Sequence, residues 1–363
     1  MKPSNMPFDS IMSKMADDFK QAGSRAHEAS KIFLDNLETD LAQTPCEVIY
    51  QEDRVRLKHY KPKTRKYKTP LLVVYALINR ETMLDLQPGR SVVQRFLDEG
   101  IDLYMIDWGY PKKKDRFQGF DDHINGYMDN IVDVIRNACG ADKINLMGIC
   151  MGGTFSVIYA ALHPEKVQNL ITTVTPTNFD TDKGLLHVWL KHMDADALVD
   201  AYGNLSSDLM NFGFLLLNPA RLMIDKYVGF MSQMDKKQFV ENFVRMEKWI
   251  FDSPDLPGEV FREFIKECYQ ANKLINNKMT VGGRLVDLQK ITMPLLNIYA
   301  KYDHLVPPEA CELLTRRIGS PDTRDICLDT GHIGIYVSSK SQKEFAPAIA
   351  AWLKERDHTN IRN

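Results

Sequence analysis

Of the 363 residues in this chain, 44% are hydrophobic and 26% are charged, fractions that are typical of a folded globular protein and exclude a disordered or low-complexity chain. The 46 basic and 48 acidic residues give a formal net charge of −2, so overall charge favours neither nucleic acid nor an anionic membrane surface as a partner. No apolar run approaches the roughly 18 residues that a membrane-spanning helix needs, and no secretory signal follows Met1, so we expect a cytoplasmic protein without a membrane span.

Residues 1–44 are predicted to form an N-terminal amphipathic helical arm. Apolar or small side chains recur at three- to four-residue spacing between positions 9 and 42, which places them on one face of a helix. That face could pack against the rest of the chain, or it could face a partner or a granule, and the sequence leaves both interpretations open.

Residues 45–177 alternate between strand-like and helix-like segments. Short, continuously apolar strands that alternate with helices are typical of an α/β protein, in which a mostly parallel sheet has helices on both faces. We expect a strand pair at 47–62, buried strands at 69–78, 101–108, 143–149 and 167–176, and helices at 91–100, 124–140 and 151–164.

This alternation stops at residues 178–287, where the sequence is helical and rich in aromatic residues. Strands are expected again at 293–300 and 323–329, before a closing helix at 342–356. We predict that 45–177 and 288–363 together form an α/β-hydrolase core, and that 178–287 form a cap, or lid, inserted between two of its strands.

A candidate nucleophile stands in GICMGG, residues 148–153, between a predicted strand and a predicted helix. A G-x-C-x-G pattern in that context is typical of the nucleophile elbow, the sharp turn on which α/β hydrolases carry their nucleophile. The turn would place Cys150 at a helix N-terminus, where unpaired amides provide a partial positive charge. We therefore predict that Cys150 is the nucleophile and that the backbone N–H of Met151 is an oxyanion donor.

An acid and a histidine are expected after the nucleophile in chain order, each just beyond a later strand. Asp303 follows the strand predicted at 293–300, and His332 follows the strand predicted at 323–329. We predict that His332 accepts the proton of the Cys150 thiol and that Asp303 orients the imidazole and stabilises its charged form.

Several other residues compete for these roles. His304 is adjacent to Asp303 and would point away if that aspartate points into the site, and Asp329 ends the strand before His332 rather than following the preceding strand. The remaining candidates receive no catalytic role: His163 and Cys139 are expected at helix ends, and His123, His187 and His192 on the surface or in the cap.

The second oxyanion donor should come from the loop after the strand at 69–78. Many esterases have an H-G-G sequence there, but residues 76–80 of this chain read ALINR, and the backbone amide of Ile78 is the best candidate. The six cysteines are scattered, without a C-x-x-C pair or a histidine at zinc-site spacing, so we predict neither a metal nor a resident cofactor.

A thiol on this scaffold favours acyl transfer over hydrolysis. Cysteine attacks thioesters readily and is itself a good leaving group, so an acyl group could pass through Cys150 to a waiting alcohol while the cap excludes water. The alternatives are a thioesterase or esterase of the same fold with a cysteine nucleophile, and a non-enzymatic granule-associated protein.

The resemblance to one family is specific. The segments INLMGICMGGTFSVIYAALHPEKVQNLITTVTPTNFD, RMEKWIFDSPD, LLNIYAKYDHLVPP and GHIGIYVSSKSQKE resemble polyhydroxyalkanoate synthases, and the short chain is similar to the catalytic subunit of the two-subunit, class III type. The resemblance runs from about residue 45 to residue 355. It implies that (R)-3-hydroxyacyl-CoA, chiefly (R)-3-hydroxybutyryl-CoA, is polymerised with release of CoA. The CoA enters as part of the substrate, and no other cofactor is implied. Cys150 would hold the growing polyester as a thioester.

The resemblance also implies partners. These are a second, non-catalytic subunit of the PhaE type, a second copy of the chain in a homodimer, and the surface of polyhydroxyalkanoate granules in the cytoplasm. His332 would activate the thiol and the 3-hydroxyl of the incoming unit. Asp303 would support His332 or, in some versions of the mechanism, serve the hydroxyl itself. Whether one thiol elongates the chain or two alternate across a dimer is left open.

Overall fold

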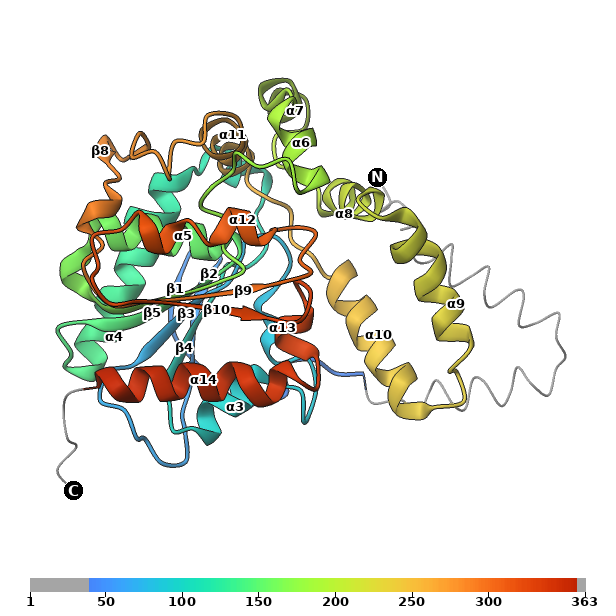
Figure 1. The fold of residues 1–363 in the computed structure, drawn as a ribbon, viewed down its shortest axis with the longest axis horizontal. Helices are drawn as coiled ribbons and strands as arrows, with labels where there is room; N and C mark the ends of the chain where they lie inside the picture. Colours follow the sequence, from blue (N-terminus) through green and yellow to red (C-terminus); the bar gives the residue numbers. More distant parts are fainter. Residues whose placement is uncertain (1–38, 358–363) are drawn as a thin grey trace, which may run out of the picture.

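The computed structural model describes residues 39–357. An eight-stranded sheet in the order β1-β2-β4-β3-β5-β6-β9-β10 forms its centre (Figure 1). Its strands are β1 (Glu47–Glu52), β2 (Val55–Tyr60), β3 (Leu71–Val74), β4 (Leu103–Asp107), β5 (Ile144–Ile149), β6 (Val167–Thr173), β9 (Leu295–Ala300) and β10 (Thr323–Leu328).

The sheet is parallel except at one edge. β1 pairs antiparallel with β2 and β2 antiparallel with β4, whereas the other neighbours are parallel. β3, β4, β5 and β9 are buried along their whole lengths, which is why their sequences are continuously apolar. The predicted α/β class and the mostly parallel sheet are confirmed.

Helices cover both faces of the sheet (Figure 1). α3 (Val92–Asp98) and α14 (Ser341–Arg356) pack together on one face, and α5 (Met151–Leu162) lies on the other. A π-helical segment, Asp122–Met128, contacts α5 and continues into α4 (Asp129–Cys139). Short helices complete the core: Glu81–Leu84, Lys113–Phe117, Pro164–Lys166, Leu288–Lys290, α12 (Pro308–Cys311), Leu314–Arg316 and α13 (Gly334–Val337).

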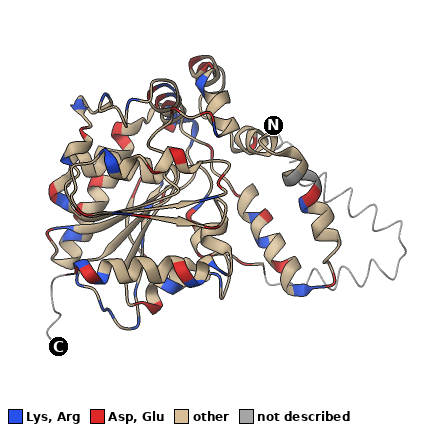
Figure 2. Ribbon diagram, in the orientation of Figure 1, with Lys and Arg blue, Asp and Glu red and all other residues tan. Residues whose placement is uncertain are grey.

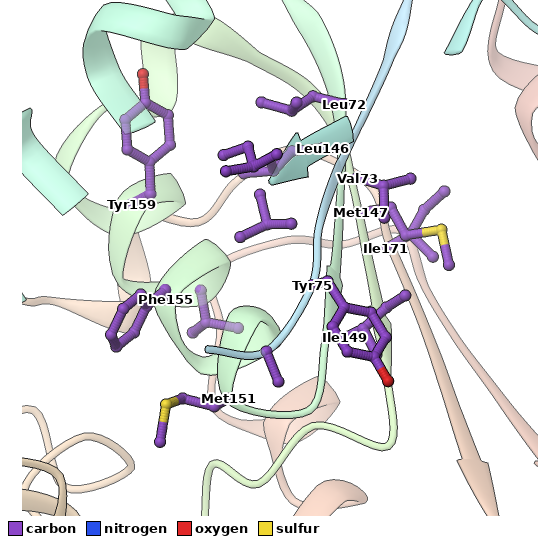
Figure 3. Close-up of a cluster of buried hydrophobic side chains, with 14 of the residues drawn as sticks. Leu72, Val73, Tyr75, Leu146, Met147, Ile149, Met151, Phe155, Tyr159 and Ile171 are labelled. Atoms are coloured by element: carbon purple, nitrogen blue, oxygen red, sulfur yellow. The ribbon is translucent and has the colours of Figure 1, made fainter. Parts of the chain in front are cut away.

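The packing between α5 and the central strands fixes the start of that helix. Leu72 and Leu146 point toward α5, and their neighbours Val73 and Met147 point to the opposite side (Figure 3). Every residue of α5 is buried. The turn before α5 is therefore held between a buried strand and a buried helix.

The segment between β6 and β9 is mainly helical, and α8 to α10 extend to one side of the core (Figure 1). It contains α6 (Leu185–Lys191), α7 (Ala195–Tyr202), α8 (Ser207–Leu216), Ala220–Asp225, α9 (Lys226–Met231), α10 (Lys237–Phe251), α11 (Gly258–Glu263), Phe264–Gln270 and the hairpin of β7 (Thr280–Val281) and β8 (Arg284–Leu285). The division into a core and a cap at 178–287 stays a prediction. Most of the predicted arm, residues 1–38 of 1–44, lies outside the described residues.

Charged residues of both signs are interspersed along the outer helices, and the strands consist mostly of uncharged residues (Figure 2). Across residues 39–357, the helices are all too short or too polar to cross a bilayer.

Candidate active site

Cys150 occupies the turn between β5 and α5, with φ 52° and ψ −124°. A non-glycine residue adopts this backbone conformation only under strain, and the surrounding structure must hold it there. The buried strand and helix on either side do so, and the Cys150 amide donates a hydrogen bond of 3.0 Å to the carbonyl of Thr173. The turn has the geometry of a nucleophile elbow, which lifts the side chain out of the backbone path.

Glycines make the close approach at this turn possible. A Cβ atom on Gly152 would fall on the backbone oxygens of Val74 and Tyr75 at the end of β3, and one on Gly148 would meet the backbone of Gly153. Glycine is therefore required where α5 begins against the sheet.

The structure brings Cys150, His332 and Asp303 together. Nδ1–H of His332 donates to Oδ2 of Asp303 at 2.6 Å, and Cys150 is close enough to His332 to raise the pKa of its imidazole. The other carboxylate oxygen, Oδ1, accepts the amides of Leu305 and Val306, each at 2.9 Å. Because its two oxygens are occupied in this way, the buried carboxylate fixes the orientation of the imidazole.

The charge state of His332 follows from this arrangement. Burial lowers the pKa of the imidazole, but the Asp303 carboxylate and the contact with Cys150 outweigh that effect and raise it to about 10. The imidazolium is therefore the favoured form at neutral pH.

A cavity of about 1200 Å³ opens at this triad of side chains. Met151 and Ile78, the two residues predicted to supply oxyanion donors, lie in its wall together with Cys150 and His332. The amide of Met151 is in the first turn of α5, where no acceptor within the helix exists. The opposite wall consists of residues from α8, α10 and the segments between them, so the cavity lies between the core and residues 178–287.

Tyrosines at the cavity were missed in the sequence, among them Tyr75 and Tyr269. Tyr75 directly follows β3 and Tyr269 lies in the segment Phe264–Gln270, and both are buried in the cavity wall. Burial and the nearby Cys150 raise the pKa of each phenol, so both hydroxyls stay neutral. The position of Tyr75 at a strand end was the one sign that could have identified it.

The competing residues lie elsewhere or have other partners. Asp329 is half-exposed, and its carboxylate lies 3.8 Å from Lys301 and 3.9 Å from Lys340. His304 lines the same cavity, but the Asp303 carboxylate contacts His332. His163 and Cys139 are at helix ends and His192 is exposed, as predicted.

The surface position predicted for His123 is wrong. Its ring is fully buried between aromatic side chains, with centroids 5.5 Å from Trp108 and 6.2 Å from Phe155, and Nδ1–H donates to the Gly119 carbonyl at 2.7 Å. Burial lowers its pKa to about 4, so it packs as a neutral aromatic ring. His187 is in the cap segment, as one of the two predictions for it stated, but it too is buried.

Within residues 39–357, no cluster of three histidine, cysteine or carboxylate side chains is arranged to hold a metal. The absence of a resident cofactor stays a prediction.

Comparison with known families gives two matches. Residues 69–339 match the family model of the alpha/beta hydrolase fold, and residues 8–96 match the N-terminus of poly-beta-hydroxybutyrate polymerase (PhaC). The second match extends the likeness into the first forty residues, so the predicted beginning near residue 45 is too late.

Curated relatives are similar in sequence to nearly the whole of this chain. The poly(3-hydroxyalkanoate) polymerase subunit PhaC of Allochromatium vinosum is 46% identical over 98% of this chain and 100% of its own length. The PhaC subunit of Thiocystis violacea is 44% identical over 96% of this chain and 99% of its own length. The PhaC subunit of Synechocystis sp. is 46% identical over 86% of this chain and 85% of its own length.

Solved structures show the fold alone. The monoacylglycerol lipase of Paleococcus ferrophilus has a TM-score of 0.53 and 17% identity over 83% of this chain and 99% of its own. MenH from S. aureus has a TM-score of 0.51 and 16% identity over 84% and 99%.

Proposed function

This chain belongs to the family of poly(3-hydroxyalkanoate) polymerase subunits PhaC, and on that basis we propose that it polymerises (R)-3-hydroxyacyl-CoA, chiefly (R)-3-hydroxybutyryl-CoA, with release of CoA. The membership makes it an enzyme of the acyltransferase class. The observation that carries the proposal is the placement of Cys150 on a strained elbow, beside a histidine that is itself held by Asp303.

Cys150 carries the acyl group. Its sulfur attacks the thioester carbonyl of the substrate as a thiolate, whose proton His332 already holds as the imidazolium, and the carbonyl oxygen gains negative charge. The amides of Met151 and Ile78 stabilise that oxyanion. The carbonyl re-forms as the carbon–sulfur bond to CoA breaks, and His332 returns the proton to the departing CoA thiolate.

Elongation needs an alcohol in place of water. The 3-hydroxyl of one unit attacks the thioester carbonyl of another, and His332 accepts the hydroxyl proton. An ester bond forms as the carbon–sulfur bond of the thioester breaks and the sulfur leaves as a thiolate. The wall of the cavity is mostly apolar and comes from both the core and residues 178–287, which suits an aliphatic polyester and disfavours water.

The further partners follow from the family. We propose a PhaE-type second subunit, a homodimer and residence at the surface of cytoplasmic polyhydroxyalkanoate granules, with no resident cofactor besides the CoA of the substrate. Apolar side chains exposed on the helices between β6 and β9 support a contact of this kind; Trp189, Tyr202, Phe212, Val228 and Met231 are examples.

Incubation with (R)-3-hydroxybutyryl-CoA tests the proposal. We expect stoichiometric CoA release and insoluble polymer from the wild type, and a loss of at least about 10⁴-fold for Cys150→Ala. Cys139→Ala is the matched control, because it removes a half-buried thiol at the end of α4 and should retain activity. Free 3-hydroxybutyrate without polymer would establish a thioesterase instead. A wild type that binds granules without releasing CoA, with granule binding unchanged in Cys150→Ala, would establish a non-enzymatic role.

A further inference from the structure

The loop that carries Ile78 is held by the C-terminal end of α10. Trp249 donates its indole N–H to the carbonyl of Arg80 at 2.8 Å, and the hydroxyl of Ser253 is hydrogen-bonded to the side chain of Asn79. These contacts join the oxyanion loop after β3 to residues more than 160 positions later in the chain.

The loop needs such support because its backbone is strained. Asn79 has a φ of 63°, in the left-handed region that asparagine tolerates better than most residues but that still costs energy. This turn directly follows Ile78, the residue whose amide is the predicted oxyanion donor. Trp249 is 3% exposed and lines the cavity beside Ile78, so its contact with the loop is shielded from water.

Ion pairs also join the loop after β3 to the C-terminal end of α10. The guanidinium of Arg80 lies 3.4 Å from Glu81 and 3.6 Å from Asp107 in the core, and 3.2 Å from Asp252, which directly follows α10. The hydroxyl of Tyr110 donates to Asp252 at 2.5 Å and accepts from Arg80 at 2.9 Å. Arg80 thus bridges carboxylates of the core and of the α10 end.

We propose that Trp249, with Ser253, is a positioning residue that holds the amide of Ile78 in the oxyanion site, so that the end of α10 must be seated for acylation to proceed. This inference rests on the proposed function, since it assigns the oxyanion role to Ile78. Neither side chain reacts; each acts through the loop. A shift of that amide weakens an interaction made in the transition state and should lower kcat more than it changes KM.

The test compares two reactions of the same thiol. Acylation of Cys150 by 3-hydroxybutyryl-CoA generates an oxyanion, whereas alkylation by iodoacetamide displaces iodide at a saturated carbon and generates none. For Trp249→Phe, which keeps an aromatic ring and removes the N–H, we expect acylation to fall roughly tenfold or more while alkylation stays within about twofold.

Trp352→Phe is the matched control. Trp352 is buried in α14, and its indole N–H has no hydrogen-bond partner among residues 39–357, so both rates should stay unchanged. Ser253→Ala is the second test variant if Trp249→Phe unfolds, as judged by circular dichroism. Equal losses in both reactions, or no loss of acylation in either test variant, would overturn the positioning role.

The same comparison with p-nitrophenyl acetate separates the two proposals. Acylation of Cys150 by this ester, measured as a burst of p-nitrophenol, also passes through an oxyanion. It does not require a hydroxyacyl-CoA. If the wild type reacts with the ester but not with 3-hydroxybutyryl-CoA, the polyester function fails, and the ratio of ester acylation to alkylation still decides the role of Trp249. A wild type that reacts with neither acyl donor would overturn both.

Discussion

The buried pair of His332 and Asp303 links protonation to folding. The pKa of His332 rises from 6.5 to about 10 in the folded protein, so between these values the folded state keeps a proton that the unfolded chain releases. The stabilisation is complete below pH 6.5 and is lost as the pH rises toward 10.

Asp303→Asn tests this linkage, because it removes the charge and keeps the side-chain size. We expect the free energy of unfolding of the wild type to fall as the pH rises from 6.5 to about 10, and that of the variant to change less. Urea denaturation at several pH values measures both slopes. Parallel slopes would show that Asp303 does not hold the proton on His332.

His187 gives the opposite pH dependence. Burial lowers its pKa to about 4, although Asp303 partly opposes this, so stability present above pH 6.5 is lost as the pH falls toward 4. Neither ring nitrogen has a hydrogen-bond partner within the described part of the chain, and the ring lies 5.1 Å from that of Tyr269.

His187→Phe should therefore keep the packing and remove the titration. We expect the variant to be at least as stable as the wild type at pH 7 and to lose less stability on acidification, by up to about 3 kcal/mol at pH 4. Chemical denaturation at pH 7, 5.5 and 4 measures this. A variant that is destabilised at pH 7 and just as acid-sensitive would show that the nitrogens are hydrogen-bonded.

At the scale of elements, the turn between β5 and α5 depends on backbone contact with β3. Gly152→Ala would press a Cβ onto the carbonyls of Val74 and Tyr75, so α5 must shift and carry the Met151 amide with it. We expect a destabilisation of about 1–3 kcal/mol and a loss of CoA release. Gly213→Ala in α8 is the control, since its Cβ meets no atom within 4 Å and should be neutral or slightly stabilising. Thermal unfolding and CoA release of both variants provide the measurement.

The long elements were predictable because their patterns are local. Continuous apolar runs identified β3, β4, β5 and β9, and α5 and α14 were expected as helices from their places in the alternation of strands and helices. The two-residue strands β7 and β8 and the four-residue helices α12 and α13 are too short to show a period, and contacts with the rest of the chain decide them.

The residues of the site also fall into those that a sequence pattern predicts and those that it does not. Chain order and strand ends were sufficient to predict Cys150, Asp303 and His332 as neighbours, and the structure places them in contact. The burial of His123 and the approach of Tyr269 depend on aromatic rings that are distant in sequence, and no local pattern records such contacts.

At the scale of the whole molecule, the cavity depends on two parts of the chain that the sequence separates. The reactive side chains come from the ends of core strands, and the opposite wall comes from α8 and α10. The hydrogen bond from Trp249 to the oxyanion loop joins the two walls. Movement of α10 would therefore change both the volume of the cavity and the geometry of the proposed oxyanion site.

The measurement that tests the account most directly is mass spectrometry of Cys150 during turnover. The protein is mixed with (R)-3-hydroxybutyryl-CoA, stopped in acid and digested, and the peptide containing Cys150 is analysed. The account predicts that this peptide carries one or more whole hydroxybutyryl units in thioester linkage, and that hydroxylamine removes them. An unmodified Cys150 peptide while CoA is being released would contradict it.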